Sequence, residues 1–231
     1  MTKKQTEKTV NATPLLYRLT NDYMFRAVFQ SYPKALEGLC RSVLRLSPRD
    51  NIKVTLRNPV ELGRNIESKE FILDLAVIVN DSIFLNLEMQ MYHDRYWIER
   101  SISYTCRSFD NLIHGENYDT VLPVVHVGFL NYDLFPEYPE FFATYQLSNV
   151  KNHNIYSDKF RISVINLNHT ELATEEDKTF ITDLWAQTFK ARLSKSHEKF
   201  ALQSDLRRQC TLRCITYTGR KSICLHNRMN I

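Results

Sequence analysis

The chain of 231 residues contains only five glycines, about two per cent of the total where roughly seven per cent is usual. A phosphate-cradling loop of the P-loop or dinucleotide-binding type needs two or three glycines within about six residues, and the isolated glycines of this chain exclude both. The net charge of +4 arises at the carboxyl-terminal end, because residues 1–190 carry 21 basic and 24 acidic side chains whereas residues 191–231 carry 9 and 2. The slightly acidic body therefore gives no general sign of polyanion binding, and the tail has a role or an origin of its own.

The amino-terminal segment predicts neither a signal peptide nor a membrane anchor. MTKKQTEKTV is polar and is followed by no apolar run, and the longest apolar stretch, over 121–130, is too short to span a bilayer. We expect residues 1–13 to be disordered and the protein to be cytoplasmic, with no membrane partner. Five cysteines, an odd number, fit a reducing compartment, and Cys40 and Cys106 are expected to be core thiols.

Helices and strands follow in an order typical of an α/β fold. TNDYMFRAVFQ predicts a helix with Thr20 or Asn21 as N-cap, and Pro33 begins a second helix. The later elements predicted by periodicity are a strand over 54–62 bent at Pro59, a hairpin of 71–79 and 82–91, a helix over 94–115, strands over 121–130, 141–149 and 160–168, and a helix over 174–191 whose Thr174 and Asp177 resemble a capping box. This order predicts a mixed β-sheet flanked by helices.

Three polar residues interrupt the apolar strands of the hairpin. Asp74 lies within FILDLAVIV, and Glu88 and Gln90 lie on one face of SIFLNLEMQM. A two-residue turn at Asn80-Asp81 would place Asp74 opposite Leu87, on the face that points away from Glu88. A three-residue turn would place Asp74 opposite Glu88, with about 4.5–5.5 Å between their Cβ atoms. We predict the three-residue turn or an equivalent bulge.

Two carboxylates at that distance in a half-buried sheet point to a divalent metal ion. They repel one another, and both stay ionised only if a cation compensates them. Oxygen ligands suit Mg²⁺ or Mn²⁺, which can lower the pKa of water and neutralise charge on a phosphodiester. Gln90 could hydrogen-bond a water molecule or a phosphate oxygen, but an amide cannot act as a general base. The alternative is that these residues simply mark the solvent face of the hairpin.

Six segments in order resemble the PD-(D/E)XK nuclease superfamily, and specifically its recombination-promoting nuclease (Rpn) and transposase branch. These segments are LTNDYMFRAVF, FILDLAV, NLEMQM, RYWIERSISYTCRSF, GENYDTVLPVVHVGFLNYDLF and ATEEDK…LWAQTFKA, which together span roughly residues 14–190. The resemblance implies a restriction-endonuclease-like α/β core with a central four-stranded mixed sheet, and metal-dependent hydrolysis of DNA. It implies Asp74 and Glu88 as metal ligands and Gln90 at the position of the superfamily's lysine. It also implies that Asp22, in the first helix, approaches the metal site from the side.

The resemblance draws attention to the helix that follows the hairpin. Arg100, Tyr104 and Arg107 recur along one stripe of it, so the two arginines could contact DNA phosphates with Tyr104 beside them. The alternative is an ordinary amphipathic helix with a solvated basic edge. The scattered histidines are assigned no role; they are His93, His126, His153 and His169.

The tail, residues 191–231, departs from the branch, whose members continue into Glu/Lys-rich helical sequence. It is either a basic segment that grips DNA or, as we favour, the product of a reading-frame change and poorly ordered. Its cysteines and histidine do not have the spacing of a standard zinc knuckle, so zinc is not expected; they are Cys210, Cys214, Cys224 and His226.

The sequence therefore predicts a nuclease-like domain over 14–190 that acts as a Mg²⁺- or Mn²⁺-dependent DNA endonuclease. A homodimer is a further expectation from the superfamily. The alternative is an inactive remnant that binds nucleic acid or a partner protein.

Overall fold

A computed structural model describes residues 16–61, 71–110 and 117–194 of the chain. The predicted disordered start at 1–13 and the part of the predicted tail from residue 195 onward, with its cysteines, lie outside the described residues. The helices are α1 (Asp22–Ser31), α2 (Pro33–Val43), α3 (Trp97–Phe109), α4 (Glu175–Thr179) and α5 (Thr182–Lys190), with 3₁₀ turns at Tyr118–Thr120 and Thr170–Leu172. The strands are β1 (Leu16–Arg18), β2 (Val54–Leu56), β3 (Val60–Glu61), β4 (Phe71–Ile72), β5 (Leu75–Val79), β6 (Ile83–Gln90), β7 (Val124–Leu130), β8 (Phe142–Ser148), β9 (Ile155–Asn166) and β10 (Arg192–Ser194).

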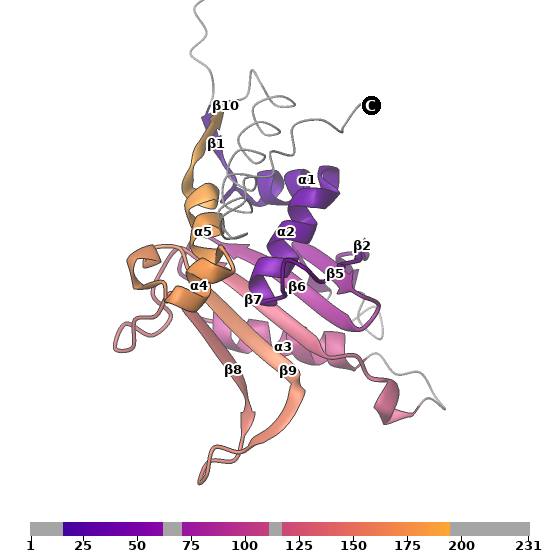
Figure 1. Cartoon of the computed structure of the whole chain (residues 1–231). Helices are drawn as coiled ribbons and strands as arrows, with labels where there is room; N and C mark the ends of the chain where they lie inside the picture. The colour runs from indigo at the N-terminus through magenta and orange to yellow at the C-terminus, as the bar shows by residue number, and fades with distance from the viewer. Residues whose placement is uncertain (1–15, 62–70, 111–116, 195–231) are drawn as a thin grey trace, which may run out of the picture.

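A mixed six-stranded sheet forms the centre of the fold, as the sequence predicts (Figure 1). Its strand order is β2-β5-β6-β7-β9-β8, in which β6, β7 and β9 run parallel and the other pairs are antiparallel. The sheet has two more strands than the four that the resemblance implies, because β2 and β8 extend it at either edge. The three parallel strands end along one edge, where Gln90, Leu130 and Asn166 lie in register.

Helices cover both faces of this sheet. Odd-numbered side chains of β5, β6 and β7 join the main core with residues of α1, α2 and α5. That core includes a cluster of aromatic rings in edge-to-face contact, formed by Phe25, Phe29, Phe129 and Phe189. Even-numbered side chains of the same strands face α3 and form two smaller apolar clusters. The polar residues Asn86, Glu88 and His126 belong to this second face, so the site is built between the sheet and α3.

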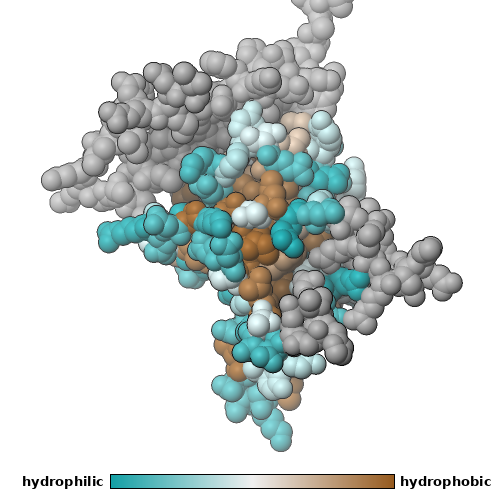
Figure 2. All heavy atoms as spheres, turned by 90° about the vertical axis from the view of Figure 1, so that its right-hand side faces the viewer, coloured by the Kyte–Doolittle hydropathy of each residue, from teal (hydrophilic) through white to brown (hydrophobic). Residues whose placement is uncertain are grey.

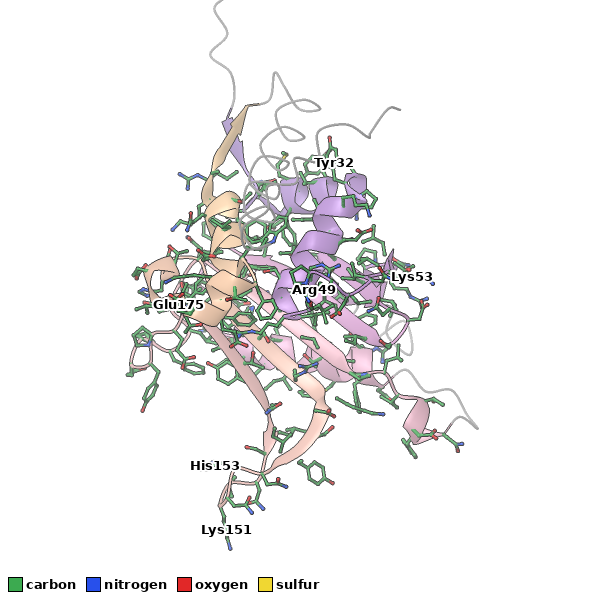
Figure 3. The ribbon with its side chains drawn as sticks, viewed as in Figure 1. Tyr32, Arg49, Lys53, Lys151, His153 and Glu175 are labelled. Atoms are coloured by element: carbon green, nitrogen blue, oxygen red, sulfur yellow. The ribbon has the colours of Figure 1, made fainter. Side chains whose placement is uncertain are left out.

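Two short pairings complete the fold. β3 pairs with β4 beside the hairpin, and the break between β2 and β3 lies at Asn58-Pro59, where the sequence predicts a bend. β1 pairs with β10, so that strand pairing continues to Ser194, past the predicted domain boundary at residue 190. At the opposite end of the sheet from the site, the hairpin of β8 and β9 projects with Lys151 and His153 at its tip (Figure 3).

Several local predictions are confirmed and two are wrong. Asn21 is the N-cap of α1, and its side chain accepts a hydrogen bond from the amide of Met24 at 3.1 Å. The capping box of Thr174 and Asp177 is present, but the helix predicted over 174–191 is two helices, because Ile181 adopts a left-handed conformation with φ of 56°. Cys40 is buried as expected, whereas Cys106 is exposed because it lies on the outer side of α3.

Within the described residues no helix is both long enough and apolar enough to span a bilayer. Figure 2 views the molecule from the β2 edge of Figure 1 and shows apolar residues in the middle of this face, bordered by hydrophilic ones.

Gly128 allows α3 to approach the sheet closely. A Cβ atom at this position would lie 2.3 Å from Cζ2 of Trp97, the first residue of α3. We therefore expect Gly128→Ala to lower the free energy of unfolding by about 1–3 kcal/mol through overpacking, measured by urea denaturation. Gly38→Ala in α2 is the matched control: its Cβ would lie 3.2 Å from Trp185, and the better helix propensity of alanine, about 1 kcal/mol, offsets that contact. Equal stability of the two variants would contradict this account.

Candidate active site

The register of the β5–β6 hairpin brings the two predicted carboxylates together. Val79 pairs with Ile83 and Leu75 with Leu87, so the turn contains three residues. The ladder ends at Leu75, and its register continued by one residue sets Asp74 opposite Glu88. The predicted three-residue turn is therefore confirmed. Asn80 and Asp81 both adopt positive φ angles of 53°, which short polar side chains such as theirs tolerate.

Asp74 lies in a bend just before β5 begins. Its carboxylate accepts a hydrogen bond of 2.8 Å from the backbone amide of Met89 in β6. Burial raises the pKa of Asp74, the Met89 amide opposes this shift, and the negative charge of Asp22 raises the pKa further. The bond to Met89 pins the carboxylate beside β6, at the level of Glu88.

Glu88 is buried in the middle of β6 with only 7% of its surface exposed. Its Oε1 atom pairs with the guanidinium of Arg100, and its Oε2 atom lies 3.4 Å from Nε2 of His126. Burial raises the pKa of Glu88 to about 7; Arg100 lowers it and the charge of Asp74 raises it. Burial prevails over the ion pair, so the fold disfavours the ionised form of this carboxylate.

Arg100 joins the helix to the strand. Its guanidinium contacts Glu88 and donates to Oε1 of Gln90 at 2.8 Å, and it also pairs with the carboxylate of Asp94 at 2.8 Å. The amide nitrogen of Gln90 donates to the carbonyl of Tyr92 at 2.9 Å, which fixes the amide orientation. Both ends of Gln90 are therefore used, and the side chain holds Arg100 against the sheet.

The other predicted site residues lie at different distances from this centre. Asp22 in α1 lies close enough to raise the pKa of Asp74. Tyr104 is half-buried one turn beyond Arg100 on α3, where burial and then the charge of Glu88 raise its pKa. Arg107 is half-buried nearly one turn further along the same helix.

A family model described as PD-(D/E)XK nuclease family transposase matches residues 19–219. The chain belongs to this family. The resemblance to the superfamily is therefore confirmed, whereas the Rpn branch stays a prediction. Neither a curated protein nor a solved structure matches the chain significantly. The match extends past residue 190 into the segment predicted to be a separate tail, whose origin stays a prediction.

PD-(D/E)XK nucleases generally use divalent metal ions, and the side chains of this site fit such an ion in part. Within the described residues no group of three or more His, Cys, Asp and Glu side chains is arranged to hold a metal. A pair of carboxylates is nevertheless enough for Mg²⁺, which keeps several of its waters. Oε2 of Glu88 is buried with no hydrogen-bond partner among the described atoms, and the charge of Asp74 raises the pKa of Glu88. Both features would be relieved by a cation between these two residues.

Three residues that the structure places in this candidate site were not predicted from the sequence. His126 is fully buried beside Glu88, and Asn86 hydrogen-bonds His126 from the neighbouring strand. The signal for both was present, since each is a polar residue in an otherwise apolar strand, the criterion that identified Glu88. Asp94 was expected to begin the helix; instead α3 begins at Trp97, and Asp94 pairs with Arg100.

The raised pKa of Glu88 predicts a pH-dependent effect of Glu88→Gln on stability. The pKa of Glu88 in the folded state is about 7, above the usual 4.5, because the folded protein favours the protonated carboxyl. This preference contributes fully to the stability of the wild type below pH 4.5 and is lost as the pH rises through 7. At pH 8 without metal, we therefore expect the variant to exceed the wild type by up to ~3 kcal/mol in free energy of unfolding, and near pH 5 to match it.

Urea denaturation in EDTA at both pH values measures this difference. Asp81→Asn is the matched control, because Asp81 lies at the exposed turn of the same hairpin, paired with Lys53 (labelled in Figure 3). A Glu88→Gln variant less stable than the wild type at pH 8 would show that the ion pair with Arg100 prevails over burial.

Proposed function

We propose that this protein is a metal-dependent DNA endonuclease that hydrolyses phosphodiester bonds with Mg²⁺ or Mn²⁺, in the recombination of mobile elements. The observation that carries the proposal is the β5–β6 register, which sets Asp74 opposite Glu88 in a chain of a nuclease family. The two carboxylates belong to the hairpin that the family resemblance singles out, and their burial makes a divalent cation the natural partner.

In this proposal Asp74 and Glu88 hold the metal ion. When bound, the ion would increase the acidity of water and withdraw charge from the phosphodiester. The Met89 amide fixes the carboxylate of Asp74, and Arg100 fixes one oxygen of Glu88. Asp22 adds negative charge on the α1 side, which strengthens the attraction for a cation.

Arg100 is proposed to replace the positive charge that the superfamily's lysine would supply. Gln90 occupies the lysine position and carries no charge, but its oxygen accepts a hydrogen bond from Arg100. The guanidinium thus lies at the place on the sheet from which the lysine would extend. Arg100 and Tyr104 would position the DNA strand, and Arg107 would contact phosphate further along α3.

DNA affinity in this proposal depends on local groups. Residues 1–190 carry 21 basic and 24 acidic side chains, so the body as a whole does not attract a polyanion. A homodimer, expected from the superfamily, would bring two such sites to the two strands of a duplex.

A plasmid-nicking assay with Mg²⁺, Mn²⁺ or EDTA tests the proposal. We expect the wild type to nick DNA with either metal and not with EDTA, and Asp74→Asn and Glu88→Gln to lose activity by about 100-fold or more. These substitutions keep the acceptor oxygens that bond Met89 and Arg100, so they remove charge without removing those contacts.

Asp81→Asn is again the matched control and should nick at the wild-type rate, because Asp81 lies at the opposite end of the hairpin from Asp74. Equal nicking by the wild type and both site variants would indicate a contaminating nuclease and refute the site.

A second candidate function is binding of nucleic acid or a partner without catalysis. The ion pair between Arg100 and Glu88 favours it, because the guanidinium already neutralises one of the two proposed metal ligands. Salt-sensitive DNA binding by the wild type, with no nicking under either metal, would support this candidate over the first.

A further inference from the structure

His126 lies under the proposed metal site. It belongs to β7, where it pairs in parallel register with Asn86 of β6. Glu88 and Gly128, two residues further along the same two strands, form the next pair on this face of the sheet. No part of its side chain is exposed. The rings of Trp97 and Tyr104 lie over it, with centroids 6.0 and 6.2 Å away. A fully buried imidazole costs free energy unless its two nitrogens have polar partners.

The partners of the two nitrogens define the tautomer. The Nδ2 atom of Asn86 lies 2.6 Å from Nδ1 of His126, and an amide nitrogen can only donate. Nδ1 is therefore the acceptor, and the single proton of the neutral ring is on Nε2. Nε2 lies 3.4 Å from Oε2 of Glu88, close to it but without the geometry of a hydrogen bond. The opposite orientation of the amide would set a lone pair of Nε2 against that oxygen whenever Glu88 is ionised, as a metal ligand must be.

The surroundings of the ring oppose a positive charge on it. Burial and then the nearby guanidinium of Arg100 lower the pKa of His126 to about 3. Neither Nε2 of His126 nor Oε2 of Glu88 has a hydrogen-bond partner among the described atoms, so each is the nearest polar group open to the other.

The contact with His126 limits how Glu88 can pair with Arg100. Guanidinium and carboxylate groups favour a bidentate arrangement, in which both carboxylate oxygens would be taken by the arginine. Here one terminal nitrogen of Arg100 bonds both Oε1 of Glu88 and Gln90, and the other pairs with Asp94. Nε of Arg100 has no hydrogen-bond partner among the described atoms, so a second contact with Glu88 is open to it, whereas Oε2 lies beside the imidazole. The separation of 3.4 Å is longer than an ordinary N–H···O bond, so Oε2 is oriented without being held tightly.

We propose that His126 is a positioning residue that orients Oε2 of Glu88 toward the divalent cation, with Asn86 fixing the tautomer that allows it. The inference rests on the proposed function, since it concerns the same metal site. Removing the donor lets the Glu88 carboxylate turn to Arg100 with both oxygens and weakens cation binding.

The tautomer is tested first and does not depend on metal binding or activity. Long-range ¹H–¹⁵N spectra of the metal-free wild type distinguish a proton on Nε2 from one on Nδ1, and the signals of His126 are those absent from His126→Gln. We expect a proton on Nε2 and none on Nδ1. A proton on Nδ1 would overturn the proposal, because the Asn86 amide nitrogen could not then donate to it.

Mn²⁺ binding, followed by calorimetry, then tests the positioning role. His126→Gln keeps an N–H close to the position of Nε2, and His126→Leu removes it at similar size. We expect His126→Gln to bind Mn²⁺ within about threefold of the wild type and His126→Leu to bind about ten- to a hundredfold more weakly. Urea denaturation of both variants separates loss of affinity from loss of folding.

The outcomes distinguish the two proposals. If the wild type binds Mn²⁺ and folded His126→Leu binds it equally well, the positioning role is refuted and the proposed function stands. If both folded variants bind equally weakly, with no rescue by glutamine, His126 has a merely structural role. If the wild type binds no Mn²⁺, the proposed function fails, and the role of His126 toward the cation fails with it.

Discussion

The pairing of Val79 with Ile83 is the constraint on which the site depends. One residue of slip would turn Asp74 to the opposite face of the sheet, into the core formed with α1, α2 and α5. The turn is held from outside the hairpin, because Asn80 exchanges hydrogen bonds with the backbone of Lys53. Lys53 directly precedes β2, so the pairing of β2 with the hairpin also helps to hold the register that brings the two carboxylates together.

That register concentrates negative charge in a buried place. Asp74, Glu88 and Asp94 lie around the guanidinium of Arg100, and the negative charge of Asp22 near Asp74 is opposed by the positive charge of Arg26. Because burial prevails over the ion pair at Glu88, the site without metal is under electrostatic strain. A cluster that only stabilised the fold would be expected to balance these charges within the protein, so the imbalance is itself an argument that a cation belongs there.

Much of the fold was predictable, because periodicity, caps and turn residues are local. The position of every strand in the hairpin and the cap at Asn21 follow from such signals. The turn residues alone did not decide the register, since Asn80-Asp81 permits turns of two or three residues, but the three-residue turn that we predicted is the one observed. His126 was missed because its role depends on the parallel pairing of β6 with β7, which brings it beside Glu88 across a separation of 38 residues in the chain. The break at Ile181 was missed because tertiary packing fixes it and the helical pattern continues through it.

The position of α3 links the packing of the fold to the charge of the site. Glu88 pairs in register with Gly128. Because Gly128 has no side chain, Trp97 packs directly against the backbone of β7 at this position. Trp97 and Arg100 are three residues apart on one face of the helix, so the contact that seats the indole also brings the guanidinium to Glu88. In the proposed site Gln90 takes the position of the superfamily's lysine, and the positive charge would then be supplied by the helix and not by the strand. The electrostatics of this site therefore depend on how closely the helix approaches the sheet, which a lysine on β6 would not require.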